Sequence, residues 1–353
     1  MLVNFTVSPS LDMGLQWYTH GIGVASLALS SFVFYLLLWR TPRHSRRYRH
    51  YLFVLQSCTT SIDIHVGLLF SPQPVFPIIG AYCTGLLCRI GVDTHILTTL
   101  VILLIGWMAA AVQFCFWFRH QSILSEESRW KAPRPLFVAV HFFLVLFFSL
   151  PAMAISPGWT PKETGRRFIR ENYPAMEWFV WKANDFIVYD PSTPPSSAIV
   201  DCVRAVVVTA VAMMVIATTH ILSILNHYAR VSRMSCRTRI FHLRMITSLC
   251  FQASVLSSMV ALPLIFFVAS ILLEVERHEL IFVSMSVIAT HSFVHSITLI
   301  STTPAYLSIV RGGFSRLLGR PLITNNKNRR VPPSLLPLNY SSAPSNSCTS
   351  TPK

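Results

Sequence analysis

Residues 21–50 read GIGVASLALSSFVFYLLLWRTPRHSRRYRH, an apolar run over 21–39 followed by five arginines over 40–50. A helix of roughly 20 apolar residues is long enough to cross the hydrocarbon core of a bilayer. The flank before this run contains no Lys or Arg, and the segment after it is strongly basic. These features are typical of a retained membrane anchor with its N-terminus outside, and not of a cleaved signal peptide.

Six further apolar windows follow along the chain. With 52% hydrophobic and 12% charged residues and a mean hydropathy of +0.52, the chain is too apolar for a soluble domain of 353 residues. Helices are expected because an open strand edge cannot satisfy its backbone in lipid. The chain is therefore predicted to be an all-α membrane protein, a seven-transmembrane-helix bundle over 21–310, with spans at about 21–39, 50–70, 86–117, 136–155, 199–222, 246–273 and 280–309.

The Lys and Arg residues are divided unequally between the two sets of loops, 21 against 6. This asymmetry predicts an extracellular N-terminus and a cytoplasmic C-terminus. The net charge of +15 could indicate a nucleic-acid binder, but the charges lie in short gaps between apolar runs, which is a topology pattern. We expect residues 1–20 to be an extracellular tail glycosylated at Asn4. Residues 311–353 are expected to form a short amphipathic segment, broken from the last span at Gly312-Gly313, and a disordered basic cytoplasmic tail.

Ionisable residues inside the spans are the first functional candidates, because they are costly in lipid. Asp63 lies about 13 residues into the second span from the inner side, and His291 about 11 residues into the seventh from the outer side. A rise of 1.5 Å per residue places them at similar depths. Together with His295 they are predicted to form a polar switch between two helix arrangements, the alternative being a static, satisfied contact.

A second group of charged residues lies near the outer ends of the third and fifth spans. Arg89 and Asp93 are four residues apart and would share a helix face, with His95 close by. Asp201 and Arg204 are three residues apart. Each set could bind a polar ligand, or each pair could simply neutralise itself. The outer loop over about 156–198 is expected to be irregular and to cap the outer mouth.

The cysteines, histidines and prolines offer few other sites. The chain has no CxxC pair that would support a metal site. A disulfide from Cys83 or Cys88 to Cys202 is one possibility for the outer cysteines, and free buried thiols are the alternative. His291 and His295 have helical ligand spacing, but no metalloprotease glutamate lies between them and no second histidine cluster faces them. No catalytic residue, metal or cofactor is therefore expected. Pro263 and Pro304 are the expected helix kinks.

Two stretches around the second span carry a family resemblance. Residues 41–52, TPRHSRRYRHYL, precede the span that holds Asp63, and residues 71–85, SPQPVFPIIGAYCTG, form the outer turn after it. This pattern resembles the nematode serpentine chemoreceptors of the Sri and Srh groups, with the Phe-Pro-Ile and Tyr-Cys details closer to Sri. The topology extends the likeness over roughly 15–310.

The resemblance implies a G-protein-coupled receptor that binds an odorant or pheromone among the outer halves of its helices. Its implied partners are a small-molecule ligand, a heterotrimeric G protein and membrane lipid, with no nucleic acid. Its implied location is the plasma membrane, as a multi-pass protein of a sensory-neuron cilium. The candidates for the G-protein side are the inner basic residues Arg119, His120, Arg230 and Arg233.

The chain departs from related receptors at two inner positions. Phe118 stands where rhodopsin-like receptors have an acid before the arginine, and Pro304-Ala305-Tyr306 stands where serpentine families have Pro-Tyr-Arg. Two other functions compete with the receptor: a seven-span transporter or channel, and a His-box membrane enzyme. Neither an internal repeat nor a charged pore-lining series favours transport.

Overall fold

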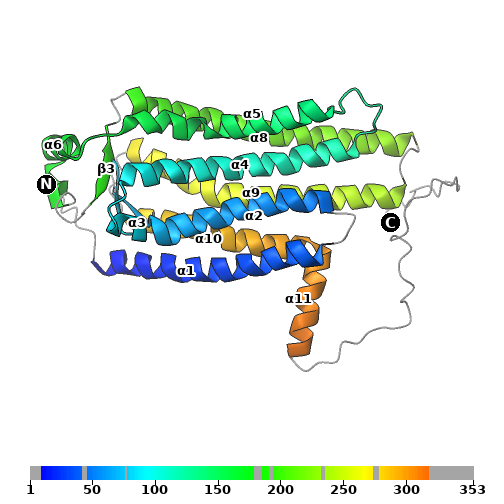
Figure 1. Cartoon of the computed structure of the whole chain (residues 1–353), viewed down its shortest axis with the longest axis horizontal. Helices are drawn as coiled ribbons and strands as arrows, with labels where there is room; N and C mark the ends of the chain where they lie inside the picture. The colour runs from blue at the N-terminus through cyan, green and yellow to red at the C-terminus, as the bar shows by residue number, and fades with distance from the viewer. Residues whose placement is uncertain are drawn as a thin grey trace, which may run out of the picture.

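The computed structural model describes residues 9–41, 46–75, 78–178, 185–190, 194–231, 235–272 and 278–317. Within these residues, seven helices are long and apolar enough to cross a membrane. They lie side by side as a bundle, as Figure 1 shows. The seven-helix architecture expected from the hydropathy pattern is therefore confirmed.

The bundle is built from seven long helices, two of which end in a π-helical turn. The first two are α1 (Pro9–Tyr35), continued by η1 (Leu36–Arg40), and α2 (Arg46–Ile64), continued by η3 (His65–Leu69). The other five are α4 (Thr94–Ile123), α5 (Arg134–Ile155), α8 (Pro194–Arg230), α9 (Cys236–Leu272) and α10 (His278–Thr302). Pro263 lies inside α9.

The helices pack closely at small residues. A side chain added at Gly106 of α4 would overlap the carbonyl oxygen of Phe148 on α5. This close approach is typical of membrane helices, whose association depends on van der Waals packing because lipid offers no hydrophobic driving force between them.

The third span begins later than the hydropathy pattern predicts. A single turn, α3 (Leu86–Arg89), is followed by Gly91 with a φ of 89°, and α4 then begins at Thr94. Asp93 precedes α4, and its carboxylate accepts a hydrogen bond from the His95 backbone N–H at 2.7 Å. The prediction that Arg89 and Asp93 share one helix face is therefore wrong, because a turn separates them.

The seventh span also ends earlier than predicted. Helix α10 stops at Thr302, and a separate helix, α11 (Pro304–Leu317), projects away from the bundle, crosswise to the long helices (Figure 1). Pro304 begins α11 instead of kinking the span, since its fixed φ and missing N–H suit a first turn. The Thr303 carbonyl accepts the backbone N–H groups of Tyr306 and Leu307, both at 3.0 Å. Gly312 and Gly313 lie within α11, so the predicted break there is wrong.

One end of the bundle, which we call the outer end because the loop charges predict it to be extracellular, carries a folded lid instead of an irregular loop. Strands β1 (Pro72–Val75), β2 (Ile79–Cys83) and β3 (Phe186–Tyr189) form an antiparallel sheet in that order. The chain between α5 and β3 forms a helical turn, η4 (Ser156–Gly158), helix α6 (Lys162–Asn172) and a second turn, η5 (Pro174–Met176). Apolar residues of the sheet, α6 and η5 make a small core of their own: Val75, Ile78, Tyr82, Ile169, Met176, Phe186 and Val188.

One disulfide lies in this lid region. It joins Cys83, at the end of β2, to Cys88 in α3, with the two Cα atoms 6.0 Å apart. Cys202 on α8 is a free thiol. The predicted bridge from Cys83 or Cys88 to Cys202 is therefore wrong, because the short connection between β2 and α3 brings the two nearby cysteines together.

Candidate functional site in the helix core

Three helices turn polar stripes toward one another in the interior of the bundle. We call this set the polar core. Its members recur at intervals of three or four residues along each helix, apart from two adjacent pairs on α10, so each stripe occupies one face. They are Ser26 and Ser30 on α1, Gln56, Thr60 and Asp63 on α2, and His291, Ser292, His295 and Ser296 on α10, and all are buried.

Asp63 and His291 meet at the outer end of the polar core, as the depth argument predicts. The Asp63 Oδ1 and His291 Nδ1 atoms are 3.6 Å apart, and the exposed fractions of the two residues are 7% and 1%. His291 Nδ1 also donates to the Ile288 carbonyl oxygen at 2.7 Å. In the neutral ring, Nδ1 therefore carries the proton and Nε2 is an acceptor. His295, one turn further along α10, is equally buried.

Gln56 joins the three helices below this pair. Its Nε2 atom donates to Ser30 Oγ on α1 at 3.0 Å and to Ser296 Oγ on α10 at 3.1 Å. Sequence reasoning missed this residue because glutamine carries no charge. The signal was present in the spacing of Gln56, Thr60 and Asp63, which places all three on one helix face.

Many polar atoms of the polar core have no hydrogen-bond partner among the described residues. A buried polar group left unpaired costs about 1–3 kcal/mol, so a static structural role would be expected to satisfy more of them. The atoms are Ser26 Oγ, Gln56 Oε1, Thr60 Oγ1, Asp63 Oδ2, His291 Nε2, Ser292 Oγ and His295 Nδ1.

His95, a predicted ligand residue, is bonded within the chain. Its Nε2 lies 3.0 Å from the Ser156 carbonyl oxygen, and its Nδ1 lies 2.9 Å from the Tyr189 hydroxyl on β3. The carbonyl can only accept, so Nε2 donates and the Tyr189 hydroxyl donates to Nδ1. Burial, followed by the nearby Asp93 carboxylate, raises the pKa of Tyr189, which keeps that hydroxyl protonated. His95 therefore fastens the lid to α4.

Asp185 makes a second attachment of the lid that sequence reasoning missed. Its Oδ2 accepts the Thr94 backbone N–H and the Thr94 hydroxyl, each at 2.7 Å, and its Oδ1 lies 2.6 Å from Lys162 Nζ. A carboxylate at the N-terminus of α4 is favoured by the helix dipole. Nothing in the local sequence distinguishes this aspartate from the other acids of the outer loop.

The remaining outer candidates are not gathered into one site. Arg204 Nη2 and Asp201 Oδ1 pair with each other at 2.8 Å on the surface of α8, with both side chains more than half exposed. Arg89 is exposed at the end of α3. These positions match the self-neutralising alternative for Asp201 and Arg204 better than a shared ligand pocket.

At the inner end of the bundle, Arg119 is buried without a carboxylate partner among the described residues. Its guanidinium carbon lies 3.5 Å from the centroid of the Tyr48 ring, a cation–π contact between α4 and α2. Its Nε and Nη2 atoms have no hydrogen-bond partner there. Tyr48 thus holds the arginine in place of the missing neighbouring acid.

His120 links α4 to α8. The His120 Nε2 and His220 Nδ1 atoms are 2.7 Å apart, and Gln121 Nε2 lies 3.2 Å from His120 Nδ1. Because the amide nitrogen donates to Nδ1, His120 Nε2 carries the proton and donates to His220. This bond ties the inner halves of the two helices together.

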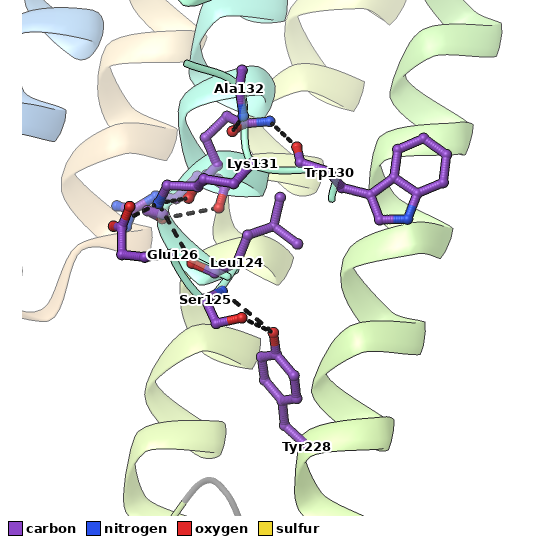
Figure 2. Close-up of polar contacts among 10 residues, drawn as sticks. Leu124, Ser125, Glu126, Trp130, Lys131, Ala132 and Tyr228 are labelled. Atoms are coloured by element: carbon purple, nitrogen blue, oxygen red, sulfur yellow. Dashed lines mark hydrogen bonds and ion pairs between the residues drawn. The ribbon is translucent and has the colours of Figure 1, made fainter. Parts of the chain in front are cut away.

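Gln121 and Lys131 order the loop between α4 and α5, and Figure 2 shows Lys131 with its contacts. Gln121 Oε1 accepts the Ala132 N–H at 2.9 Å, and its Nε2 donates to the Trp130 carbonyl at 3.2 Å. Lys131 Nζ donates to the carbonyl oxygens of Gln121 and Leu124, at 2.9 and 3.4 Å, near the end of α4. A cation is favourable there because of the helix dipole.

Tyr228 connects the same loop to α8. Its hydroxyl accepts the Ser125 N–H at 3.3 Å and donates to Ser125 Oγ at 3.4 Å, as the close-up shows (Figure 2).

Arg230 is exposed at the end of α8. Arg233 and Asn4 lie outside the described residues. Within the described part of the chain, no three His, Cys, Asp or Glu side chains gather in a way that could hold a metal ion.

The structure is thus a seven-helix membrane bundle with a polar interior and a small folded cap on one end. The model of the family described as serpentine type 7TM GPCR chemoreceptor Sri matches residues 5–310, and the chain belongs to this family. A search of curated proteins found no match. The chain is therefore a multi-pass membrane protein of a chemoreceptor family.

Proposed function

We propose that this protein is a G-protein-coupled chemosensory receptor whose polar core switches between two packings of α2 against α10. A small odorant or pheromone would bind among the outer halves of the helices and favour one packing over the other. A ligand shifts such an equilibrium only by its difference in affinity for the two states. The observation that carries the proposal is the buried contact between Asp63 and His291, surrounded by polar atoms without partners.

The proposed direction of signalling follows the charge asymmetry of the loops. The N-terminus is placed outside and the inner ends face the cytoplasm, in the plasma membrane of a sensory cilium. Arg119, His120 and the exposed Arg230 then lie on the side where a heterotrimeric G protein binds. Opening of the inner ends would require α8 to separate from α4, which breaks the bond between His120 and His220.

A ligand screen tests this proposal directly. Cells expressing the full chain are exposed to a volatile and pheromone panel, with calcium and cyclic-nucleotide readouts. We expect at least one compound to give a response that disappears when G-protein activation is blocked. A ligand-driven flux that persists without G protein would instead indicate a transporter or channel.

Asp63→Asn separates the switch from a structural role. The substitution keeps the size of the side chain and removes a buried carboxylate that has one unpartnered oxygen, so thermal stability should not fall. Ligand potency should change by about 5- to 150-fold, the range of a typical coupling free energy. The matched control is Glu163→Gln on α6, where the carboxylate is 82% exposed. Unchanged potency in Asp63→Asn would contradict the switch.

A further inference from the structure

A group of arginines at the inner end of α1 has no countercharge in the neighbouring chain. We call this group the arginine corner. The sequence contains no Asp or Glu over 13–62 or over 280–353, which include both helices of the corner and the whole of α11. The acids Glu126 and Glu127 lie in the loop between α4 and α5, on the far side of the bundle from α1 (Figure 1). The members of the corner are Arg40 at the end of η1 and Arg46, Arg47 and Arg49 at the start of α2.

Arg40 is held in one orientation and still has free donors. The π-helical turn η1 places it over Tyr35, whose hydroxyl accepts from Arg40 Nε at 3.0 Å, with the guanidinium carbon 5.7 Å from the ring centroid. The two terminal nitrogens of Arg40 have no hydrogen-bond partner among the described residues, and the side chain is exposed. Arginine binds a phosphate in a bidentate manner through such a pair of N–H groups. Arg49 Nη1 donates to the Leu38 carbonyl oxygen at 3.0 Å, which brings a second positive charge to the same helix end.

An aromatic ladder continues from Arg40 along the exposed face of α1. It consists of Phe32, Tyr35 and Trp39, with ring centroids 6.3 Å apart for the first pair and 5.7 Å for the second. The exposed fraction is 70% for Trp39 and 38% for Tyr35, so this face is open to lipid. Tyrosine and tryptophan are enriched where a spanning helix meets the headgroups. Arg40 therefore lies at the level of the lipid phosphates, with apolar surface for an acyl chain directly beneath it.

We propose that the arginine corner and the aromatic ladder together bind one anionic phospholipid. Arg40 holds the phosphate, the other arginines supply the positive potential, and an acyl chain packs on the aromatic ladder. The cytoplasmic leaflet, which the loop charges place at this end, is the leaflet that contains anionic lipids. A zwitterionic lipid suits the site less well, because its ammonium group is repelled by the corner. An acidic segment of a soluble protein suits the charge but does not reach the ladder inside the bilayer.

Native mass spectrometry of the full chain tests the proposal by counting the lipids retained from mixed micelles of phosphatidylserine and phosphatidylcholine. We expect wild type to retain one phosphatidylserine in preference to phosphatidylcholine. Arg40→Gln should weaken this binding by at least about tenfold, the smaller effect of a hydrogen bond between charged groups. Arg134→Gln is the matched control, because it removes an exposed arginine at the same end of the bundle. General attraction to an anionic surface amounts to about fivefold per arginine. Equal losses in the two variants overturn the proposal.

Tyr35→Phe tests the positioning of Arg40 without changing any charge. The substitution keeps the aromatic ladder and removes only the acceptor of Arg40 Nε. We expect phosphatidylserine to bind several-fold more weakly, whereas Tyr18→Phe, also on the exposed face of α1, should match wild type. Attraction by surface charge alone predicts no effect, so wild-type binding in Tyr35→Phe contradicts a built site. Thermal unfolding in phosphatidylcholine alone should be the same for all variants, because the changed side chains are exposed.

Competition distinguishes a lipid from other anions. Inorganic phosphate and glycerophosphoserine, which have no acyl chains, should not displace phosphatidylserine from wild type. Displacement by inorganic phosphate would show a site for a free anion and overturn the proposal. Unchanged lipid binding in Arg40→Gln, with loss of G-protein activation, would show a protein contact instead and also overturn it. The lipid binds without odorant or G protein, so a chain that retains it but never signals contradicts the proposed function alone. A chain that signals with no preference for phosphatidylserine contradicts only this site.

Discussion

At the residue scale, the buried ionisable groups divide into two kinds. His95 and Asp185 have their hydrogen-bonding atoms occupied by neighbouring elements, and they hold the lid on the outer end of α4. Asp63 Oδ1 and His291 Nδ1 contact each other, whereas Asp63 Oδ2 and His291 Nε2 have no hydrogen-bond partner among the described residues. In the proposed function, the first kind fixes one arrangement and the second allows another.

Tyr189→Phe tests the structural kind. The change removes the donor to His95 Nδ1 and leaves that buried acceptor unpaired, so the free energy of unfolding should fall by about 1–3 kcal/mol. The raised pKa of Tyr189 means that this stabilisation is complete below about pH 10, the ordinary tyrosine value, and is lost as pH rises through the folded-state pKa. Chemical unfolding between pH 6 and 9 should therefore show a constant difference from wild type. Tyr18→Phe, on the exposed face of α1, is the control.

At the element scale, contacts at the helix ends attach the bundle to the lid, to the loop between α4 and α5, and to α11. The outer end of α4 is capped by Asp93 and by the lid residue Asp185, and its inner end by Lys131. Helix α11 is attached at its start by the Tyr306 hydroxyl, 2.8 Å from Thr41 Oγ1 after α1. The contacts of Asp185 and Tyr306 join segments that lie far apart in the sequence. The cap by Asp93 and the contact of Lys131 are local.

Gln121→Ala tests the order of the loop between α4 and α5. The Ala132 N–H loses its acceptor and the Trp130 carbonyl its donor, so the loop should open more often. Hydrogen exchange of the Ala132 amide should accelerate by about tenfold for each 1.4 kcal/mol lost. Glu126→Ala is the matched control, because its ion pair with Lys131 is formed by a carboxylate that is 89% exposed and should contribute little. Equal protection in Gln121→Ala and wild type would show that the loop is held by other contacts.

At the scale of the whole molecule, the lid and α11 mark opposite ends of the bundle (Figure 1). Assignment of these ends to the two sides of the membrane rests on the loop charges. With the N-terminus outside, the lid faces the extracellular medium and the loop ordered by Gln121 faces the cytoplasm.

Glycosylation at Asn4 tests this orientation. The sequon Asn4-Phe5-Thr6 should be modified, and that at Asn339 should not, because only the first is placed outside. Glycosidase treatment should increase the gel mobility of wild type and of Asn339→Gln, while Asn4→Gln should already migrate at the deglycosylated position. A wild-type chain that is unmodified at Asn4 would contradict the extracellular N-terminus and with it the receptor topology.

The number and approximate position of the membrane helices follow from the sequence, because about 20 consecutive apolar residues have few alternatives in lipid. The juxtaposition of Asp63 and His291 could also be predicted, since depth in the bilayer is set by a constant rise per residue. The prediction that Pro304 kinks the seventh span was wrong. The apolar pattern resumes after Pro304 at Ala305, Leu307 and Ile309, and only the backbone shows that α10 ends at Thr302 and a new helix begins.

The sequence by itself therefore determined the seven-helix class, the family resemblance and the polar pair in the interior. Tertiary structure alone decided the lid, the pairing of Cys83 with Cys88 and the anchoring by Asp185. The physical reason is that burial in lipid is a local property of a segment, which composition reports. Contacts between distant segments depend instead on which faces the packed helices turn toward each other, and a single sequence does not report those directly.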